Sequence, residues 1–196
     1  MAHHVYNTEG FIVESAPRGE ANKMYLIFTE ELGMVRATAQ GVRFLKSKLR
    51  FALQDMSYAR VSLVRGKDMW RVTNARAEWN VYKQYKDNKD VLFALAQIFA
   101  LLRRLIPGEE KNEALFRYLY DACMFLESKE LLPEEVKSYE RIVVLNILHY
   151  LGYGVSTQEL AVFIDVPLST ELLEKMIKEK TKALQEINRS LKETQL

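Results

Sequence analysis

Cysteine is almost absent from this sequence, in which Cys123 is the single example. One cysteine cannot form an intramolecular disulfide or a cysteine-rich zinc site, so nothing indicates an oxidising compartment. Cys123 lies in an apolar run with helical spacing, and we expect it to be a small buried hydrophobic residue. We therefore expect no structural metal and no cofactor.

The known signatures of catalysis are missing as well. No HExxH, GxSxG or P-loop pattern occurs, and the three histidines are the adjacent His3 and His4 and the distant His149. The carboxylates are scattered through helical segments at spacings typical of salt bridges. We therefore expect a protein that is not an enzyme.

Long apolar runs are also lacking. The most apolar window, residues 91–106, contains Arg103 and Arg104 and is too short and too charged to span a membrane. The first residues are polar and have no apolar core region, so we expect no signal peptide. These absences predict a cytoplasmic protein without membrane association.

Charge is unevenly distributed along the 196 residues, a length that suits one large domain or two small ones. Residues 1–80 carry 12 basic and 8 acidic side chains, whereas residues 81–196 carry 16 and 18. The first part is thus net basic (+4) and the second net acidic (−2). This difference suggests two units with two kinds of partner.

The strongest local feature is a basic segment, residues 43–50, which holds four cations and no acid. The wider window from Arg36 to Arg76 holds ten Lys or Arg against two Asp, a net charge of +8. A cationic segment between strands is a common way to hold a polyanionic backbone. An ordinary solvated loop explains the same charges, and this segment alone does not separate the two interpretations.

The first part of the chain shows the two-residue alternation of strands. Strands are predicted over residues 5–16, 23–29, 34–41, 58–64 and 69–76, with Val35 and Ala37 on one face of the third and Arg36 and Thr38 on the other. Five short strands, with an insertion at residues 43–52 between the third and fourth, match an OB-fold barrel. An SH3-like barrel is the main alternative.

Aromatic residues are a second requirement for an OB-fold that binds single strands, because bases stack on them beside a cationic groove. The available candidates are Tyr25, Phe44, Tyr58 and Trp70. Most aromatic side chains in so small a barrel belong to its core.

The second part of the chain shows helical periodicity. Apolar residues at spacings of three and four predict helices over residues 91–106, 115–126 and 133–152, a short helix near 158, and a last helix from about Thr170. The whole is therefore an α+β protein, with a five-stranded OB-fold barrel in residues 1–80 and an all-α domain in residues 81–196.

Several motifs, in this order, resemble those of one family, the RecO family of bacterial recombination mediators. They are Glu9-Gly10-Phe11-Ile12-Val13, Arg18-Gly19-Glu20-Ala21-Asn22-Lys23, Thr29-Glu30-Glu31-Leu32-Gly33, Gly41-Val42-Arg43 followed by Lys46-Ser47-Lys48-Leu49, and Leu151-Gly152-Tyr153-Gly154. The resemblance implies an OB-fold and a helical domain that bind single- and double-stranded DNA and anneal complementary strands. It also implies help in loading RecA together with RecR and single-stranded DNA-binding protein, within a bacterial, nucleoid-associated setting.

The sequence departs from the family pattern in its last part. Many members carry a four-cysteine zinc module after the Leu-Gly-Tyr element, whereas residues 155–166 contain no cysteine here. The last helix resembles a short replacement for a fuller C-terminal region. The surfaces through which family members contact their partners, above all single-stranded DNA-binding protein, are therefore not implied for this last part of the chain.

The resulting hypothesis is a non-enzymatic mediator that holds DNA phosphates without reading sequence. Its expected DNA-binding residues are Arg36, Arg43, Lys46, Lys48, Arg50, Arg65, Lys67, Trp70 and Arg71. Two alternatives remain at this point: a protein-interaction module that docks acidic tails, and an RNA-binding OB-fold protein outside recombination.

Overall fold

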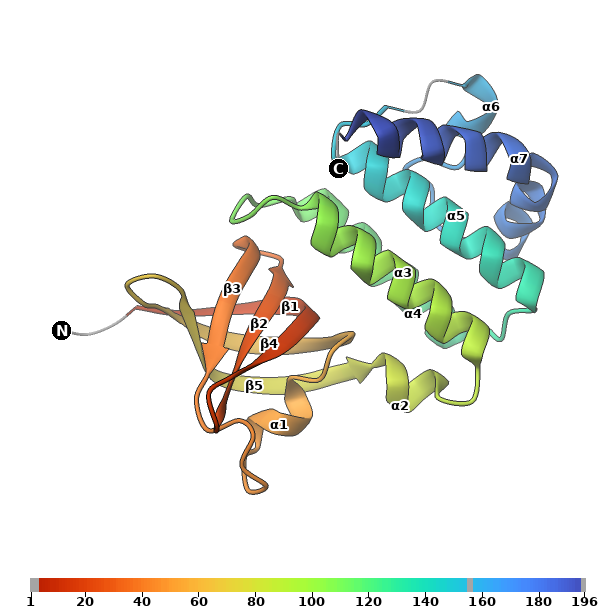
Figure 1. The fold of residues 1–196 in the computed structure, drawn as a ribbon. Coiled ribbons are helices and arrows are strands. Elements are labelled where there is room, and N and C mark those ends of the chain that lie inside the picture. The colour runs from red at the N-terminus through yellow and green to blue at the C-terminus, as the bar shows by residue number, and fades with distance from the viewer. Residues whose placement is uncertain (1–3, 155–156, 195–196) are drawn as a thin grey trace. The chain divides into compact units, whose positions relative to one another are not determined.

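The computed structural model describes residues 4–154 and 157–194 of the chain. Five strands form its first part (Figure 1): β1 (Val5–Arg18), β2 (Asn22–Thr29), β3 (Gly33–Ala39), β4 (Ser57–Arg65) and β5 (Trp70–Asn80). They close into a barrel in the order β1-β2-β3-β5-β4. The β3–β5 pair is parallel and the other pairs are antiparallel.

This topology is that of an OB-fold, with a short helix between the third and fourth strands. The helix, α1 (Leu49–Ala52), begins within the basic segment and precedes β4. The five strands and the intervening element were both expected from the sequence, and the structure confirms them. The strand order and the position of α1 favour the OB-fold over the SH3-like alternative.

The barrel interior follows from the alternation of side chains along each strand. Val35, Ala37 and Ala39 of β3 are fully buried, while Arg36 between them is exposed. A single cluster of buried residues joins these positions to side chains from all five strands. Burial of this apolar face is the main force that closes the barrel.

A second short helix, α2 (Val81–Tyr85), follows β5 directly. The Asn80 side chain accepts a hydrogen bond from the Lys83 backbone N–H at 2.7 Å, which satisfies a donor of the first turn. Five residues are too few to show an apolar period, which is why the sequence did not predict this helix.

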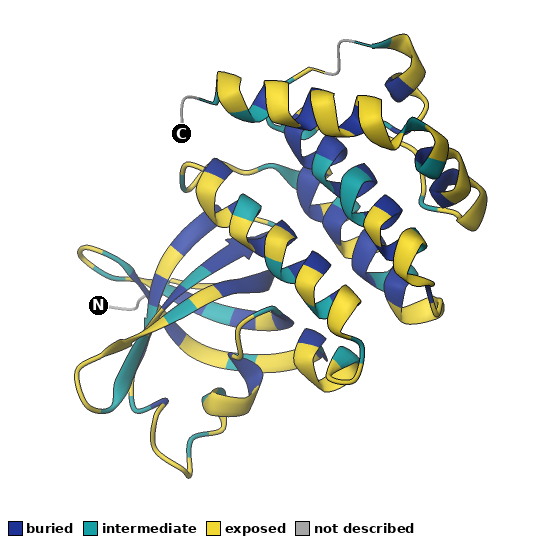
Figure 2. Cartoon of the chain, turned by 45° about the vertical axis from the view of Figure 1, so that its right-hand side comes forward, coloured by how far each residue is buried: buried dark blue, intermediate teal, exposed yellow. Residues whose placement is uncertain are grey.

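The remaining helices form the second part. They are α3 (Lys89–Leu105), α4 (Glu113–Ser128), α5 (Pro133–Tyr150), α6 (Gln158–Ala161) and α7 (Thr170–Glu193). Half of the residues of α5 are buried, whereas α7 keeps an exposed outer side (Figure 2). The helices expected from the sequence are therefore present, and α5 ends before Gly152, whose φ of 89° suits a residue without a Cβ.

Asn146 is the main buried polar side chain of α5. Its Nδ2 donates to the carbonyl oxygens of Ile142 and Phe163, each at 2.8 Å, and its Oδ1 accepts from the Asp165 backbone N–H at 2.8 Å. These bonds hold the turn after α6, where Asp165 has a φ of 54°.

The chain divides into two compact units, and each unit consists of two separate stretches of sequence. The barrel unit comprises the residues up to Asp87 together with Ile106–Lys111, and the helical unit comprises Asn88–Leu105 and the chain from Asn112 onward. The boundary expected after residue 80 differs from this division at α2 and at residues 106–111. No helix within the described ranges is long and apolar enough to cross a membrane.

The Ile106–Lys111 segment packs on the barrel through backbone contacts. The Met34 backbone N–H donates to the Gly108 carbonyl oxygen at 2.9 Å. Gly33 lies so close to Glu110 that a Cβ at position 33 would stand 2.2 Å from the Glu110 carbonyl oxygen. Only glycine fits at this position, where φ is 69°.

Candidate nucleic-acid interface

The basic segment is a series of turns fixed to the barrel at both ends. Its flanking residues Val42 and Leu53 are each about 1% exposed, whereas every residue from 43 to 51 is exposed or half-buried. Gly41 begins the turns with a φ of 62° and donates its N–H to the Asn22 side chain at 2.9 Å. The segment is thus exposed to solvent, while the buried residues Val42 and Leu53 fix its two ends to the barrel.

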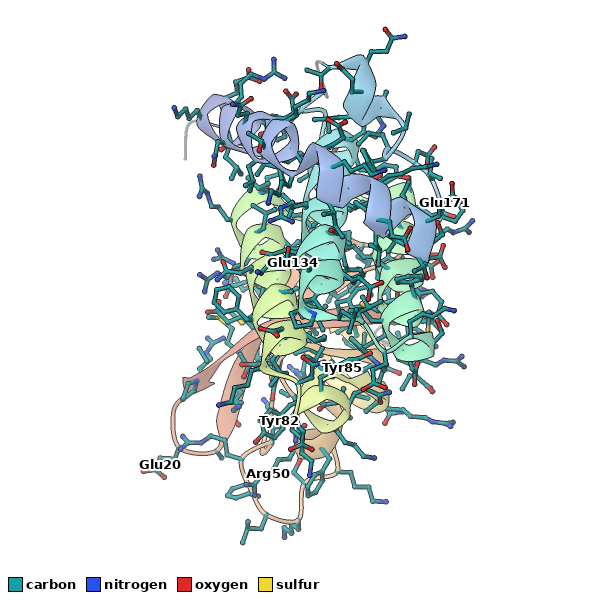
Figure 3. All side chains as sticks on the ribbon, turned by 90° about the vertical axis from the view of Figure 1, so that its right-hand side faces the viewer. Glu20, Arg50, Tyr82, Tyr85, Glu134 and Glu171 are labelled. Atoms are coloured by element: carbon teal, nitrogen blue, oxygen red, sulfur yellow. The ribbon has the colours of Figure 1, made fainter. Side chains whose placement is uncertain are left out.

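Arg43 ties the basic segment to the turn between β1 and β2. Its backbone N–H donates to the Ala21 carbonyl oxygen at 3.0 Å, and its Nη1 donates to the Gly19 carbonyl oxygen at 2.9 Å. A guanidinium has five N–H donors, so further donors remain for a ligand. Glu20 lies at the tip of this turn and Arg50 lies on α1 (Figure 3).

Two further cations lie on the outer face of neighbouring strands. Arg36 projects outward from β3. Thr38 lies two residues after Arg36 on the same strand, and its register partner on β5 is Arg71. Because side chains two residues apart share a face, Arg36, Thr38 and Arg71 lie on the same outer surface. That surface adjoins the end of β3 from which the basic segment leaves.

Seven of the expected residues form no salt bridge with any part of the chain that the structure describes, and all seven are exposed. These unpaired barrel cations are Arg36, Arg43, Lys46, Lys48, Arg50, Lys67 and Arg71. Lys67 comes from the loop between β4 and β5, and the others come from β3, β5, the basic segment and α1. Exposed ammonium and guanidinium groups without a carboxylate partner are available to phosphate oxygens.

Arg65 is the expected cation that does have a partner. Its guanidinium forms a salt bridge with Glu109 and lies 4.9 Å from the centre of the Trp70 ring. Glu109 belongs to the Ile106–Lys111 segment, far from Arg65 in sequence. The positive charge of Arg65 is therefore already compensated by a carboxylate and an aromatic face.

Two other cations of the basic window are compensated in the same way. Arg60 lies 3.1 Å from a Glu9 carboxylate oxygen and 3.5 Å from one of Glu78, which also contacts Arg76 at 3.5 Å. All three carboxylate partners, Glu9, Glu78 and Glu109, lie outside the window from Arg36 to Arg76. The net charge of +8 therefore overstates the charge that a polyanion meets.

The aromatic candidates divide sharply by burial. Trp70 is 4% exposed, with the edge of Tyr6 against it at a centroid distance of 5.1 Å, so the expected open stacking face at Trp70 does not exist in this structure. Tyr25 and Tyr58 are buried too, whereas Phe44 is 55% exposed. The physical reason is that β-strand aromatics turn inward to fill the small barrel.

Sequence reasoning missed two residues at this surface. Phe51 of α1 is 68% exposed, and no pattern predicted this because a four-residue helix has no measurable period. Arg18 ends β1, and its guanidinium contacts the Met69 sulfur next to the β4–β5 loop. The position of Arg18 in the first turn of a predicted OB-fold is a signal that could have identified it.

Two buried groups, Tyr25 of the barrel and Cys123 of α4, stay protonated near neutral pH. Burial, followed by the nearby Asp55 carboxylate, raises the pKa of Tyr25 to about 12. Burial alone raises the pKa of the Cys123 thiol to about 12, so this thiol stays protonated. Among the described residues, which exclude His3, no group of three or more His, Cys, Asp or Glu could hold a metal ion.

Comparison with known proteins gives a consistent result. Residues 1–78 match the family model described as Recombination protein O N terminal. A curated protein of Alkaliphilus metalliredigens named DNA repair protein RecO is 28% identical over 145 residues, which cover 74% of this chain and 57% of that protein. The protein of the same name from Dehalococcoides mccartyi is 29% identical over 161 residues, covering 81% of this chain and 60% of that protein.

A third relative has lower identity and similar coverage. The DNA repair protein RecO of Thermodesulfovibrio yellowstonii is 25% identical over 159 residues, or 79% of this chain and 63% of that protein. The matched region thus spans roughly three fifths of the length of these relatives. The N-terminal family model and the relatives that extend into the helical unit agree with the OB-fold topology, and the chain is similar in sequence to the RecO family.

Proposed function

We propose that the barrel unit binds DNA through its phosphates and without reading base sequence. The observation that carries this proposal is the set of unpaired barrel cations on β3, β5, the basic segment and the β4–β5 loop. An OB-fold uses the face of its second and third strands and the adjoining loops for oligonucleotides. Arg36 lies on β3, Lys67 lies in the loop between β4 and β5, and Arg43 is bonded to the turn between β1 and β2.

We further propose that this binding serves the annealing of complementary strands. Cations on a bound strand neutralise its phosphates and lower the repulsion that a second strand meets. The bases are not required for phosphate contacts, so they stay available for pairing. No covalent step is involved, and the chain acts as a mediator rather than an enzyme.

The biological setting that we propose is DNA repair and recombination, as the names of the relatives suggest. The chain would bind single- and double-stranded DNA and help to load RecA, with RecR and single-stranded DNA-binding protein as partners. A complex of the full chain with each partner, measured by analytical ultracentrifugation, tests these associations directly.

Binding and annealing measurements test the central proposal. Affinity for an oligonucleotide of arbitrary sequence should fall linearly with salt on a double logarithmic scale, and complementary strands should pair faster with the protein than without it. Salt-independent or absent binding contradicts the proposal and favours an interaction module for acidic protein tails. Tighter binding to RNA than to DNA of the same sequence favours an RNA-binding role.

A further inference from the structure

The basic segment and α1 expose an unusual amount of apolar surface. Phe44 is 55% exposed, Leu45 is 84% exposed and Phe51 is 68% exposed. Single exposed apolar residues are common on protein surfaces, but three within eight residues of one segment suggest contact with another molecule.

Phe44 is held in place although more than half of it is exposed. Its backbone N–H donates to the Gly41 carbonyl oxygen at 3.1 Å. Its ring lies against the Gly41 backbone, where a Cβ at position 41 would stand 3.3 Å from Phe44 Cδ2. A ring supported on one side loses less conformational freedom when a ligand covers the other side.

The same segment forms an open hollow whose lining is half cationic and half apolar. Its walls are Arg43, Phe44, Leu45 and Lys46. Arg43 is positioned by its bond to Gly19, and no acid lies between residues 43 and 50. This combination fits a ligand with a flat apolar face flanked by negative charge.

A nucleotide of a single strand has this chemistry, since a base has two π faces and its neighbours in the chain are phosphates. In a duplex, the faces of the bases are covered by stacking and are not accessible to a side chain on the outside. Aromatic stacking in a cationic groove is the general way in which proteins hold single strands.

We propose that this hollow receives an unpaired base, which stacks on Phe44 while Arg43 and Lys46 contact the adjoining phosphates. The basic segment thereby selects single-stranded over double-stranded DNA. Pairing of two strands removes the base from Phe44 and weakens the hold on the annealed product. This inference rests on the proposed DNA binding of the barrel and specifies which form of DNA the segment recognises.

The test uses the full chain and three probes of equal length: a mixed-sequence single strand, an abasic single strand and a duplex. The double substitution Phe44→Ala with Leu45→Ala should weaken binding to the mixed-sequence strand by roughly 5- to 150-fold, the range found for loss of one stacked base. Binding to the abasic strand and the duplex should change by less than about twofold, with the salt slope retained, because the phosphate contacts remain.

Two further variants separate stacking from a general effect. Phe44→Tyr keeps the ring and should retain the preference for the mixed-sequence strand. Phe93→Ala removes a ring that is 64% exposed on α3, in the helical unit, and should leave all three affinities unchanged. Circular dichroism melting curves should coincide for all variants because the altered side chains are exposed.

The outcomes distinguish this inference from the proposed function. If the wild-type chain binds none of the three probes, the proposed DNA binding is wrong. If it binds all three with a normal salt slope but the double variant weakens the mixed-sequence and abasic strands equally, only the stacking inference is wrong. A third outcome is that the double variant loses the wild-type chain's binding to anionic phospholipid vesicles while its DNA affinity is unchanged. That result would assign Phe44 and Leu45 to a lipid surface and overturn the inference.

Discussion

The barrel unit and the helical unit both carry exposed lysines and arginines, but their neighbours differ. In the barrel unit, the cations of the basic segment have no acid near them in sequence and form no salt bridge within the described ranges. In the helical unit, Lys175 lies 2.7 Å from Glu171, and Lys182 lies 3.1 Å from Glu179 and 3.4 Å from Glu159.

This difference shows that the number of cations is a poor measure of phosphate affinity. A lysine that already has a carboxylate partner must lose that partner before it binds a phosphate. Helical spacing of three or four residues brings Lys and Glu together by default, whereas a chain of turns does not. The irregular backbone of the basic segment is thus part of what leaves its cations available.

The largest expected effect comes from charge reversal in the barrel unit. Arg43→Glu, Lys46→Glu and Lys48→Glu together should strongly weaken DNA binding, because three phosphate contacts become repulsive. The slope of log affinity against log salt should flatten by roughly 2 to 3, at about 0.7 to 0.9 for each lost contact. Titration of a labelled oligonucleotide at several salt concentrations measures both quantities, and an unchanged slope would place the DNA site elsewhere.

The matched control reverses three cations of α7. Lys175→Glu, Lys178→Glu and Lys182→Glu remove as many positive charges as the barrel variant, but two of these lysines are already paired with carboxylates. DNA affinity should stay within about threefold of wild type, because two of the three charges are already compensated by carboxylates. Equal losses in the two triple variants would show that the DNA path crosses both units.

The next prediction separates stability from binding in the helical unit. Asn146→Ala removes two buried hydrogen bonds and one that is partly buried, and leaves the Asp165 N–H and the Phe163 carbonyl without this partner. The free energy of unfolding should fall by about 2 to 4 kcal/mol, while DNA affinity stays unchanged under folding conditions. Urea denaturation measures the loss, and the exposed Asn188→Ala on α7 should change stability by less than ~0.5 kcal/mol.

A smaller effect is expected at Arg65, the expected DNA-binding cation that already has a carboxylate partner. Glu109→Gln removes its carboxylate partner and should raise DNA affinity about 1.5- to 5-fold, the equivalent of an exposed salt bridge of ~0.2–1 kcal/mol. Glu110→Gln removes the same charge from the same segment without touching that salt bridge. Equal gains in both variants would indicate a general charge effect rather than the release of Arg65.

The smallest effect concerns the pH dependence of the α7 surface. The hydrogen bond and charge of Lys175 lower the pKa of Glu171 below its ordinary value of 4.5. Its folded pKa is therefore below its unfolded pKa, so its contribution to stability is present above the unfolded value and is lost as pH falls through the folded value. Glu171→Gln should lower the urea midpoint slightly at pH 7 and not at about pH 2, because the wild-type carboxylate is then protonated as well. A deficit that persists at low pH would mean that the carboxylate charge is not the cause.

The sequence by itself determined the five strands and the long helices, although not the assignment of residues 81–87 and 106–111 to the barrel unit. Alternation such as Val35, Ala37 and Ala39 against Arg36 indicates a strand with one buried face, and the structure confirms that face. The long helices follow from apolar spacing over four or more turns, and Pro133 stands at the first position of α5 as expected. These features depend on residues that are close together in the sequence, so they can be predicted from the sequence alone.

The availability of each candidate residue was decided only by the tertiary structure. Arg65 and Lys67 are alike in sequence context, yet folding brings Glu109 to Arg65 and leaves Lys67 exposed. Trp70 was expected to contact the ligand but is buried, because the start of β5 turns it into the barrel, whereas Phe51, for which the sequence predicted no role, is exposed on α1. Salt bridges and burial depend on residues that are distant in the chain and adjacent in space, and no local pattern of charge or hydrophobicity specifies those pairs.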